Sequence, residues 1–354
     1  MTQRIAVLRA ISLGDFIVAL PALYALRAHF PDAHIDLLAR PWMHELAEKR
    51  PFPFNSVISV PVFPGVYDDP AKIEDIVKQE AFFSEMQKKR YDLAIQLHGG
   101  GRNSNPFVKR LGANYTIGMK TDDAPDLDKT IPYRLYQHEV HRYLEVVSLA
   151  GASPVAIDPK IPTIEEDYRE ATEFIRGINS PYVVLHTGAS DSRRIWPADS
   201  YAQLGDRLYE EGYEIVLTGT ISEENIITEV QKAMKHQAVN LCGKLSLRAL
   251  IGVLKQTRAV ISNDTGPMHL ARAIGIPTIG IYWFPNMIHW SPVTRSTNRT
   301  AISWIQECEV CRQPLFDRDS QIPLNEIESC GHMKSYVSSV TVDEVFRKTI
   351  ELIS

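Results

Sequence analysis

The chain has 354 residues, 44% of them hydrophobic and 23% charged, which is enough for two globular domains with filled cores. Its net charge of −5 argues against nonspecific nucleic-acid binding as the main activity, though it leaves room for one basic pocket. No segment is apolar for long enough to cross a bilayer, and Arg9 and Asp15 interrupt the apolar stretch that a secretory signal needs. We therefore expect a cytoplasmic protein that binds no nucleic acid.

Strands and helices alternate along the first part of the chain. A β-rich run at 4–9 leads into a polar turn and then a helical pattern over 15–29 that contains Pro21. The later predicted elements are strands at 35–39 and 91–97, a helix from about 105, and a helix over 138–150. This alternation predicts βαβ units and a parallel sheet.

A stretch rich in proline and small residues, 152–162, has the composition of a linker, and the alternation restarts after it. We predict strands at 182–186, 214–218, 259–262 and 278–281, and helices at 201–211, 223–235, 247–256, 267–274 and 342–353. The layout is therefore two α/β domains, 1–160 and 161–335. We expect the terminal segment 336–354 to form a helix that packs back on the first domain.

In doubly wound sheets, ligands bind at the carboxyl ends of the strands. The stretch LHTGASDSRRIWP (185–197) follows one predicted strand, and small residues such as Thr187 and Gly188 allow backbone N–H groups to approach an anion. The guanidinium of Arg194 suits phosphate oxygens. A solvated basic loop explains this stretch equally well when it is considered alone.

The stretch LTGTISEEN (217–225) follows another strand and begins with Thr218 at the strand end. Glu223 has the chemistry to accept hydrogen bonds from ribose hydroxyls. Acidic residues are common in first helical turns, so helix capping is the favoured interpretation of this stretch by itself.

The stretch ISNDTGPMHLARAIG (261–275) combines a polar turn with a helix start. One of residues 263–265 would cap the helix, and Pro267 fits its first position. A helix N-terminus is an anion site, Gly266 permits close approach, and His269 in the first turn would face the same ligand. We predict a nucleotide diphosphate site here, formed by Asp264, Thr265, Gly266 and His269.

The stretch RAISLGDFIVALPAL (9–23) places Asp15 in a strand-to-helix turn with Arg9 at the strand end. Asp15 is either a plain N-cap or a carboxylate that faces the cleft between the two halves. A second glycine-rich turn, HGGGRNS (98–104), makes Arg102 available to an anion or to sugar hydroxyls.

Together these stretches resemble the heptosyltransferases, glycosyltransferase family nine, which use ADP-heptose in lipopolysaccharide core assembly. SLGDFIVALPAL (12–23) is similar to the family's N-terminal motif, HTGASDSRRIWP (186–197) to its phosphate motif, and SNDTGPMHLARAIGIPTIGIY (262–282) to its most specific motif. The resemblance implies a GT-B fold, with two Rossmann-like domains facing each other across a cleft, the first for the acceptor and the second for the nucleotide-sugar donor.

The resemblance also implies an inverting, metal-independent sugar transfer that requires no catalytic cofactor. It makes Asp15 the general base, Arg9 the basic residue beside it, and Arg194, Thr265, Gly266 and His269 the residues around the donor diphosphate. The stretch YWFPNMIHW (282–290) departs from the family pattern and forms either an acceptor surface or packing at the cleft edge.

The sequence leaves the acceptor open. A lipopolysaccharide core sugar, another glycan, and a protein side chain, as in relatives that glycosylate autotransporters, all remain candidates. A lipid-linked acceptor would imply peripheral contact with the inner membrane face. Two other functions stay open: a GT-B nucleotide-sugar epimerase and a non-catalytic nucleotide-sugar-binding protein. Asp15 argues against the second, because pure binding needs no carboxylate at the acceptor position.

Four cysteines in a chain of this length do not form a disulfide scaffold. Cys308 and Cys311 form a C-x-x-C pair, and Cys330 and His332 follow about 20 residues later. Three thiolates and an imidazole suit a structural Zn²⁺ or iron, and free thiols are the alternative. Some relatives bind iron through such a segment. The Asp-x-Asp patterns at 126–128 and 317–319 are interpreted as solvated charges.

Overall fold

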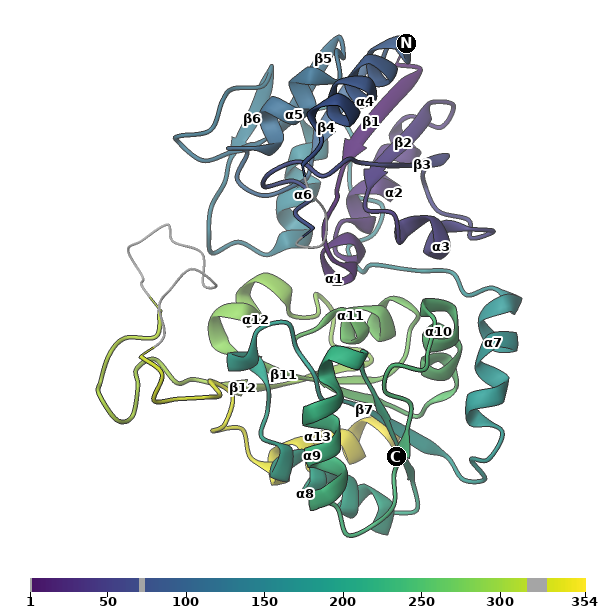
Figure 1. The fold of residues 1–354 in the computed structure, drawn as a ribbon, viewed down its shortest axis with the longest axis vertical. Coiled ribbons are helices and arrows are strands. Elements are labelled where there is room, and N and C mark those ends of the chain that lie inside the picture. Colours follow the sequence, from purple (N-terminus) through teal and green to yellow (C-terminus); the bar gives the residue numbers. More distant parts are fainter. Residues whose placement is uncertain (1, 70–73, 317–329) are drawn as a thin grey trace. The chain divides into compact units, whose positions relative to one another are not determined.

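The computed structural model describes residues 2–69, 74–316 and 330–354 (Figure 1). The chain divides into two compact units, Met1–Pro162 and Thr163–Ser354. Each unit contains one six-stranded sheet in which neighbouring strands run parallel. The predicted α/β class with two doubly wound units is therefore confirmed. Within the described residues, no helix combines the length and the apolar character that a membrane span requires.

The first unit contains the sheet with strand order β3-β2-β1-β4-β5-β6. Its strands are β1 (Arg4–Leu8), β2 (His34–Ala39), β3 (Ser56–Ser59), β4 (Leu93–Gln96), β5 (Tyr115–Lys120) and β6 (Lys129–Pro132). Its helices are α1 (Leu13–Ile17), α2 (Leu20–His29), α3 (Met43–Ala47), α4 (Ile76–Lys88), α5 (Ser104–Arg110) and α6 (Glu139–Ser148).

Strand β1 lies at the centre of this sheet, where the strand order reverses, between β2 and β4. Its residues from Ile5 to Leu8 are fully buried, and so are those of β4 in nearly every case, because helices cover both faces of a parallel sheet. The loops after β1 and β4 therefore meet at one point of the sheet edge, which is where doubly wound folds bind ligands.

The helix predicted over 15–29 forms two helices instead, α1 and α2, with Val18 and Ala19 between them. Pro21 lies at the start of α2, where a missing backbone N–H breaks no helical hydrogen bond. The break places Asp15 in a one-turn helix of its own directly after β1.

The second unit contains the sheet with strand order β12-β11-β10-β7-β8-β9. Its strands are β7 (Tyr182–His186), β8 (Glu214–Thr218), β9 (Val239–Asn240), β10 (Val260–Asn263), β11 (Thr278–Trp283) and β12 (Asn298–Ser303). Its α-helices are α7 (Glu165–Ile175), α8 (Ala198–Glu210), α9 (Glu224–Ala233), α10 (Leu247–Gln256), α11 (Gly266–Ala273), α12 (Phe284–Trp290) and α13 (Val342–Ile353). Short 3₁₀ turns occupy Ser192–Arg194 and Ile221–Glu223.

The terminal helix α13 packs on α8 and on strands β11 and β12 of the second unit, rather than on the first half as we expected. Its apolar residues Val345, Phe346 and Ile350 join the core of that unit, and Trp196 Nε1 donates to Val340 O just before the helix, at 2.9 Å. The helix therefore completes the second core, because that core supplies an apolar surface directly beside it.

Candidate functional site

The loops of the second unit gather where β7 and β10 lie side by side, at the reversal of strand order. Asn263, the last residue of β10, donates from Nδ2 to Thr187 O at 2.8 Å and to Gly188 O at 3.1 Å. Its Oδ1 accepts from Trp196 N at 3.0 Å. One buried amide therefore fixes both ends of the loop after β7. The sequence alone marks Asn263 only as a capping candidate, because its partners are far away in the chain.

Two buried polar atoms of this loop have no hydrogen-bond partner within the described structure: Thr187 Oγ1 and Arg194 Nε. The terminal nitrogens of Arg194 lie 3.4 Å from Asp264 Oδ2 and 3.0 Å from Ser190 Oγ. Buried polar atoms in folded proteins almost always have partners, so these two atoms of one loop have hydrogen-bonding capacity left for a ligand.

Helix α11 begins beside this loop with its first N–H groups uncapped. Its N-cap residue, Thr265, makes no side-chain bond to the helix, because its hydroxyl lies 3.0 Å from Ser262 Oγ instead. The backbone N–H at Gly266 and the helix dipole therefore remain available to an anion. Asp264, Thr265 and Gly266 are brought together with Thr187 and Arg194 at one strand-end site, as the sequence predicted.

His269 is almost fully buried and contacts charged groups on both sides of its ring. Its Nε2 lies 3.3 Å from Asp264 Oδ1, and Arg272 donates to its Nδ1. Because a guanidinium only donates, Nδ1 must accept, so Nε2 carries the proton and donates to Asp264. His269 thus orients Asp264, in addition to lying in the first helical turn as we predicted.

Asp264 remains ionised at neutral pH. Burial opposes its charge, but the hydrogen bond from His269 and the positive charges of Arg194 and Arg272 outweigh that effect and lower the pKa of the carboxyl. The site therefore holds a fixed carboxylate behind a cationic loop.

Thr218 and Glu223, which we predicted to bind the nucleotide, both have hydrogen-bond partners within the second unit. Thr218 Oγ1 lies 3.2 Å from His186 Nδ1, in the core. Glu223 Oε2 accepts from Thr220 N at 2.7 Å, so the capping interpretation holds for this oxygen. Its Oε1 reaches the loop after β7, where a Cβ on Gly188 would lie 1.8 Å from it. Only glycine leaves room for that carboxylate.

In the first unit, Asp15 lies inside α1, where Ser12 is the N-cap residue. The plain N-cap interpretation of Asp15 is therefore wrong. Its side chain is about one-fifth exposed, and Ser12 Oγ donates to Oδ2. Asp15 is thus a partly accessible carboxylate at the carboxyl end of the central strand.

Arg9 lies behind Asp15 and is buried. Its Nε and Nη2 donate to Asp15 O at 3.0 and 2.8 Å, and Nη2 also lies 3.3 Å from Asp15 Oδ1. Its Nη1 donates to Leu97 O, after β4, at 2.7 Å. The structure therefore places Arg9 beside Asp15, as the resemblance implies, with its guanidinium held by internal partners.

Arg102, which we expected to be available to an anion or to sugar hydroxyls, is exposed and forms an ion pair with Asp123. The Asp-x-Asp pattern at 126–128 consists of exposed aspartates, as expected for solvated charges. Asp126 pairs with Lys120 at 2.6 Å, and Asp128 Oδ2 accepts from Thr116 N at 2.7 Å. The second such pattern, 317–319, lies outside the described residues.

The cysteine-rich segment forms a compact cluster. The sulfurs of Cys308, Cys311 and Cys330 and a ring nitrogen of His332 all lie within 4.8 Å of one another. Cys308 Sγ is 3.9 Å from His332 Nδ1, near the separation of about 3.6 Å between two ligand atoms of tetrahedral zinc. The set predicted from the spacing is therefore brought together.

The turn that carries Cys308 and Cys311 has the shape of a metal knuckle. Arg312 N donates to Cys308 O at 2.9 Å, and Cys308 N donates to Gln313 O at 2.8 Å. Arg312 has φ +60°, a left-handed conformation that costs free energy in a non-glycine residue. Hydrogen bonding from the backbone N–H groups of Cys311 and Val310 lowers the pKa of the Cys308 thiol to about 6. The donor set and its geometry fit zinc or iron.

A family model described as glycosyltransferase family 9 (heptosyltransferase) matches residues 80–315, about two thirds of the chain. The chain belongs to glycosyltransferase family 9. It is therefore a glycosyltransferase, and the resemblance drawn from its sequence motifs is confirmed.

Known members of the family share the fold of this chain. Lipopolysaccharide heptosyltransferase 2 of Escherichia coli (strain K12) is 25% identical over 345 residues, 89% of this chain and 95% of its own. The structure of E. coli ADP-heptose lps heptosyltransferase II has a TM-score of 0.75 at 20% identity, covering 99% and 98% of the two chains. The dodecameric iron-containing heptosyltransferase TibC, in complex with ADP-D-β-D-heptose, has a TM-score of 0.56 at 13% identity, covering 100% and 77%. These likenesses confirm the GT-B fold.

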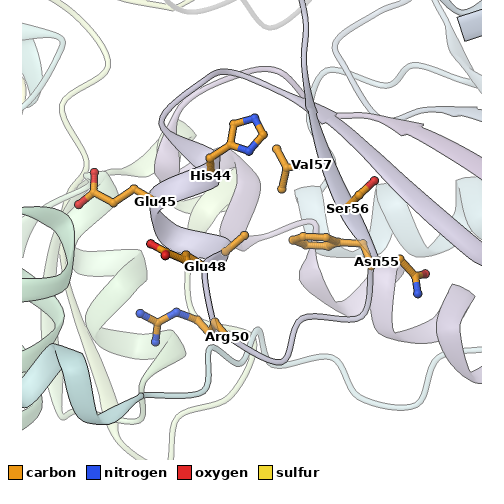
Figure 2. Close-up of a pocket in the computed structure, with 9 residues that line it drawn as sticks. His44, Glu45, Glu48, Arg50, Asn55, Ser56 and Val57 are labelled. Carbon is orange, nitrogen blue, oxygen red and sulfur yellow. The ribbon is translucent and has the colours of Figure 1, made fainter. Parts of the chain in front are cut away.

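Figure 2 shows a surface hollow of this glycosyltransferase between α3 and β3. Its polar side chains already have partners in the protein. His44 Nε2 lies 3.0 Å from Ser59 Oγ, Ser56 donates to Asp36, and Asn55 Oδ1 accepts from Ile35 N at 2.9 Å. None of the predicted site residues lines it, so it carries no role in the site.

His98, two residues after β4 in this family 9 enzyme, was not predicted as a site residue. Ala10 N donates to its Nδ1 at 3.3 Å. Burial, together with the positive charges of Arg9 and Arg40, lowers the pKa of His98 to about 3. The ring is therefore neutral in the folded protein above about pH 3. Its bond to Ala10 N links the loop after β4 to the loop after β1.

We expect His98 to make the first unit sensitive to acid. Between pH 6.5 and about 3 the unfolded chain binds a proton that the native ring does not, so stability falls as pH falls, by about 2 kcal/mol at pH 5. Urea unfolding at pH 7.5 and pH 5 measures this loss. His98→Asn, whose side-chain oxygen can replace Nδ1 as acceptor, should show a loss smaller by that amount. An equal pH dependence in both proteins would contradict the assignment.

Proposed function

We propose that this protein transfers heptose from ADP-heptose to a hydroxyl of a lipopolysaccharide core, with inversion and without a catalytic metal. The observation that carries the proposal is the pair of buried, partnerless atoms Thr187 Oγ1 and Arg194 Nε beside the uncapped start of α11. A diphosphate supplies the acceptors that such donors need. The names of the relatives supply the sugar nucleotide.

The donor binds to the second unit in this proposal. Thr187, Gly188 and Arg194 contact the diphosphate from the loop after β7, and Thr265 and Gly266 contact it from the start of α11. Asp264, which His269 orients, is placed to accept from a sugar hydroxyl. Arg194 and the backbone N–H groups stabilise the departing diphosphate by preorganised electrostatics, which is the work that a metal ion performs in other transferases.

The first unit provides the acceptor side. The Asp15 carboxylate takes the proton from the acceptor hydroxyl as its oxygen attacks the anomeric carbon. The bond between that carbon and the β-phosphate oxygen breaks, and ADP leaves with the electron pair. Attack from the face opposite to ADP inverts the anomeric centre. General base catalysis of this kind contributes about 10²- to 10⁴-fold.

We propose a lipopolysaccharide core as the acceptor because relatives of this chain are lipopolysaccharide heptosyltransferases. A lipopolysaccharide precursor would be lipid-linked, so we place the protein in the cytoplasm, with peripheral contact at the inner membrane face. A protein acceptor is the alternative within the same chemistry. A nucleotide-sugar epimerase or a pure binding protein would share the donor loops but not the need for Asp15.

The donor proposal predicts that the protein binds ADP more tightly than UDP or GDP in calorimetric titration without added metal. Arg194→Ala should weaken ADP binding about 10- to 100-fold, because it removes charge-assisted hydrogen bonds to phosphate. Arg207→Ala, which removes a partly exposed arginine paired with Asp343 in the same unit, is the control and should bind ADP normally.

The other outcomes of this titration are also informative. Preference for UDP or GDP would retain the diphosphate site but discard heptose as the sugar. Absence of binding to all three nucleotides would favour a degenerate scaffold and remove the proposed mechanism.

We also propose that Cys308, Cys311, Cys330 and His332 hold one structural Zn²⁺ or iron. The ligand positions and the knuckle turn support it, and the site has no part in the transfer step. A bound ion would join the chain after β12 to the segment that carries Tyr336, whose ring packs on Trp283 at 4.9 Å between centroids. The metal would thereby stabilise the edge of the second sheet.

Elemental analysis of the purified protein should find about one zinc or iron per chain. Replacing Cys308 and Cys330 by serine should remove it and lower Tm. Cys242→Ser is the matched control, because Cys242 lies outside the cluster, bonded to Thr220 O at 3.2 Å, and should leave the metal content unchanged. Metal-free native protein, or equal loss in the control, would end this proposal.

A further inference from the structure

A continuous row of buried side chains joins helix α6 to Asp15 in the first unit. The row runs from Glu139 and Tyr143 on α6 to Arg9 after β1, and all three are at most 5% exposed. The mechanism above uses only its last member, Asp15. Burying several titratable groups in one place costs free energy of folding, which suggests that the row serves a function.

The links of the row are direct. Tyr143 Oη donates to Glu139 Oε2, which fixes the ring. The guanidinium carbon of Arg9 lies 4.7 Å from the centroid of that ring, within the range of a cation–π contact. Arg9 then holds Asp15 through its backbone oxygen and through Oδ1. Each group therefore limits the freedom of the next.

The protonation states of Arg9 and Tyr143 are compatible with these contacts. Burial opposes the charge of Arg9, but Tyr143, Asp15 and Glu139 outweigh it and raise its pKa, so Arg9 remains cationic. Burial raises the pKa of Tyr143 well above its ordinary value, so its hydroxyl keeps the proton that it donates to Glu139.

We infer that Tyr143, through its aromatic face, is a positioning residue for the transfer reaction and acts through Arg9 on the Asp15 carboxylate. This inference rests on the proposed function of Asp15. Only Ser12 and Arg9 contact the carboxylate oxygens of Asp15 in the described structure, so the position of Arg9 decides where one of the two oxygens lies. Misplacing a catalytic group by about 1 Å can cost 10²-fold in rate.

A purely architectural role for the row is the competing explanation, since Tyr143 also helps α6 to dock. The two explanations differ in which variants lower kcat. Tyr143→Phe keeps the ring beneath Arg9 and loses only the hydroxyl, whereas Tyr143→Leu removes the aromatic face. Positioning therefore predicts a large difference between the two variants, while docking predicts loss of stability without a specific loss of kcat.

The experiment measures ADP release from ADP-heptose with heptose-deficient lipopolysaccharide core oligosaccharide as acceptor. Tyr143→Leu should lower kcat about 10- to 100-fold, with KM for ADP-heptose within about three-fold of native. Tyr143→Phe should keep kcat within about three-fold. Arg9→Lys should retain more activity than Arg9→Met, because it keeps the charge behind Asp15.

Phe83→Leu is the matched control. Phe83 is buried in the same unit, and Arg110 stacks on its ring at 3.8 Å, so this change removes a comparable contact without touching the row. Its kcat should equal the native value at a temperature well below Tm. If Phe83→Leu and Tyr143→Leu lower kcat equally, or if Tyr143→Leu leaves it unchanged, the positioning role is overturned.

The failure of this inference is distinguishable from that of the proposed function. Native activity that Asp15→Asn abolishes, together with an unaffected Tyr143→Leu, would remove only the positioning role. No ADP release by the native protein, or full activity in Asp15→Asn, would remove both.

Discussion

Replacing Asp15 by asparagine is expected to lower kcat about 10²- to 10⁴-fold while leaving affinity for ADP unchanged within about two-fold. The amide has the size of the carboxylate and can still accept from Arg9, so the local structure should persist. It cannot take a proton from the acceptor hydroxyl at neutral pH. The loops that we propose for the donor belong to the second unit, so ADP binding should not change. ADP release and calorimetric titration measure the two quantities.

Asp123→Asn provides the control for this substitution. Asp123 is an exposed carboxylate of the same unit whose charge partner is Arg102, so its replacement should leave kcat at the native value. A drop in ADP affinity in Asp15→Asn that matches the drop in turnover would contradict the base assignment, because it would place Asp15 at the donor.

Arg142→Met is expected to lower the free energy of unfolding of the first unit by about 3–5 kcal/mol at pH 7. Arg142 is fully buried, pairs with Glu139, and donates to the carbonyl oxygen of Leu135 at 3.3 Å. Removing it leaves a buried carboxylate without its main cation. Burial already raises the pKa of Glu139 although Arg142 and Arg9 oppose that effect, so an unpaired Glu139 would be costlier still. Hydrogen exchange of peptides from 2–69 and 74–162 measures the loss.

An exposed ion pair provides the comparison for this loss. Arg347 pairs with Glu351 at 2.8 Å on the surface of α13, and Arg347→Met should cost no more than about 0.5 kcal/mol. The loss in Arg142→Met should shrink at pH 4, because Glu139 can then take up a proton and needs no cation. A loss below about 1 kcal/mol at pH 7 would show that Arg142 is not needed to balance Glu139.

The regular elements of the second unit were predictable because their local signals are strong. β7, β8, α10 and α13 begin and end at the predicted residues. Ser246 caps α10 and Thr341 caps α13, each accepting from a backbone N–H three residues on. Short or edge elements such as β6 were missed, since an exposed strand carries little hydrophobic pattern.

The candidate site was only partly predictable, because the sequence indicates which residues follow the strands but not which partners their side chains have. Thr187, Arg194 and Gly266 follow the carboxyl ends of strands, so their shared position follows from the sheet alone. The partners of Arg9 and Arg102 do not follow from it. Both are arginines in strand-end loops, yet one is buried behind Asp15 and the other pairs with Asp123 at the surface.

The family, the doubly wound α/β class and the loops that form the candidate site follow from the chain alone, because periodicity, caps and motif spacing are local properties of the chain. Which polar atoms meet depends on the tertiary structure. Asn263 bonds to Thr187 across 76 positions, and Arg9 bonds to Leu97 across 88. Such pairs form because strands far apart in the chain become neighbours in a parallel sheet, and only that neighbourhood shows which side chains are left to face a ligand.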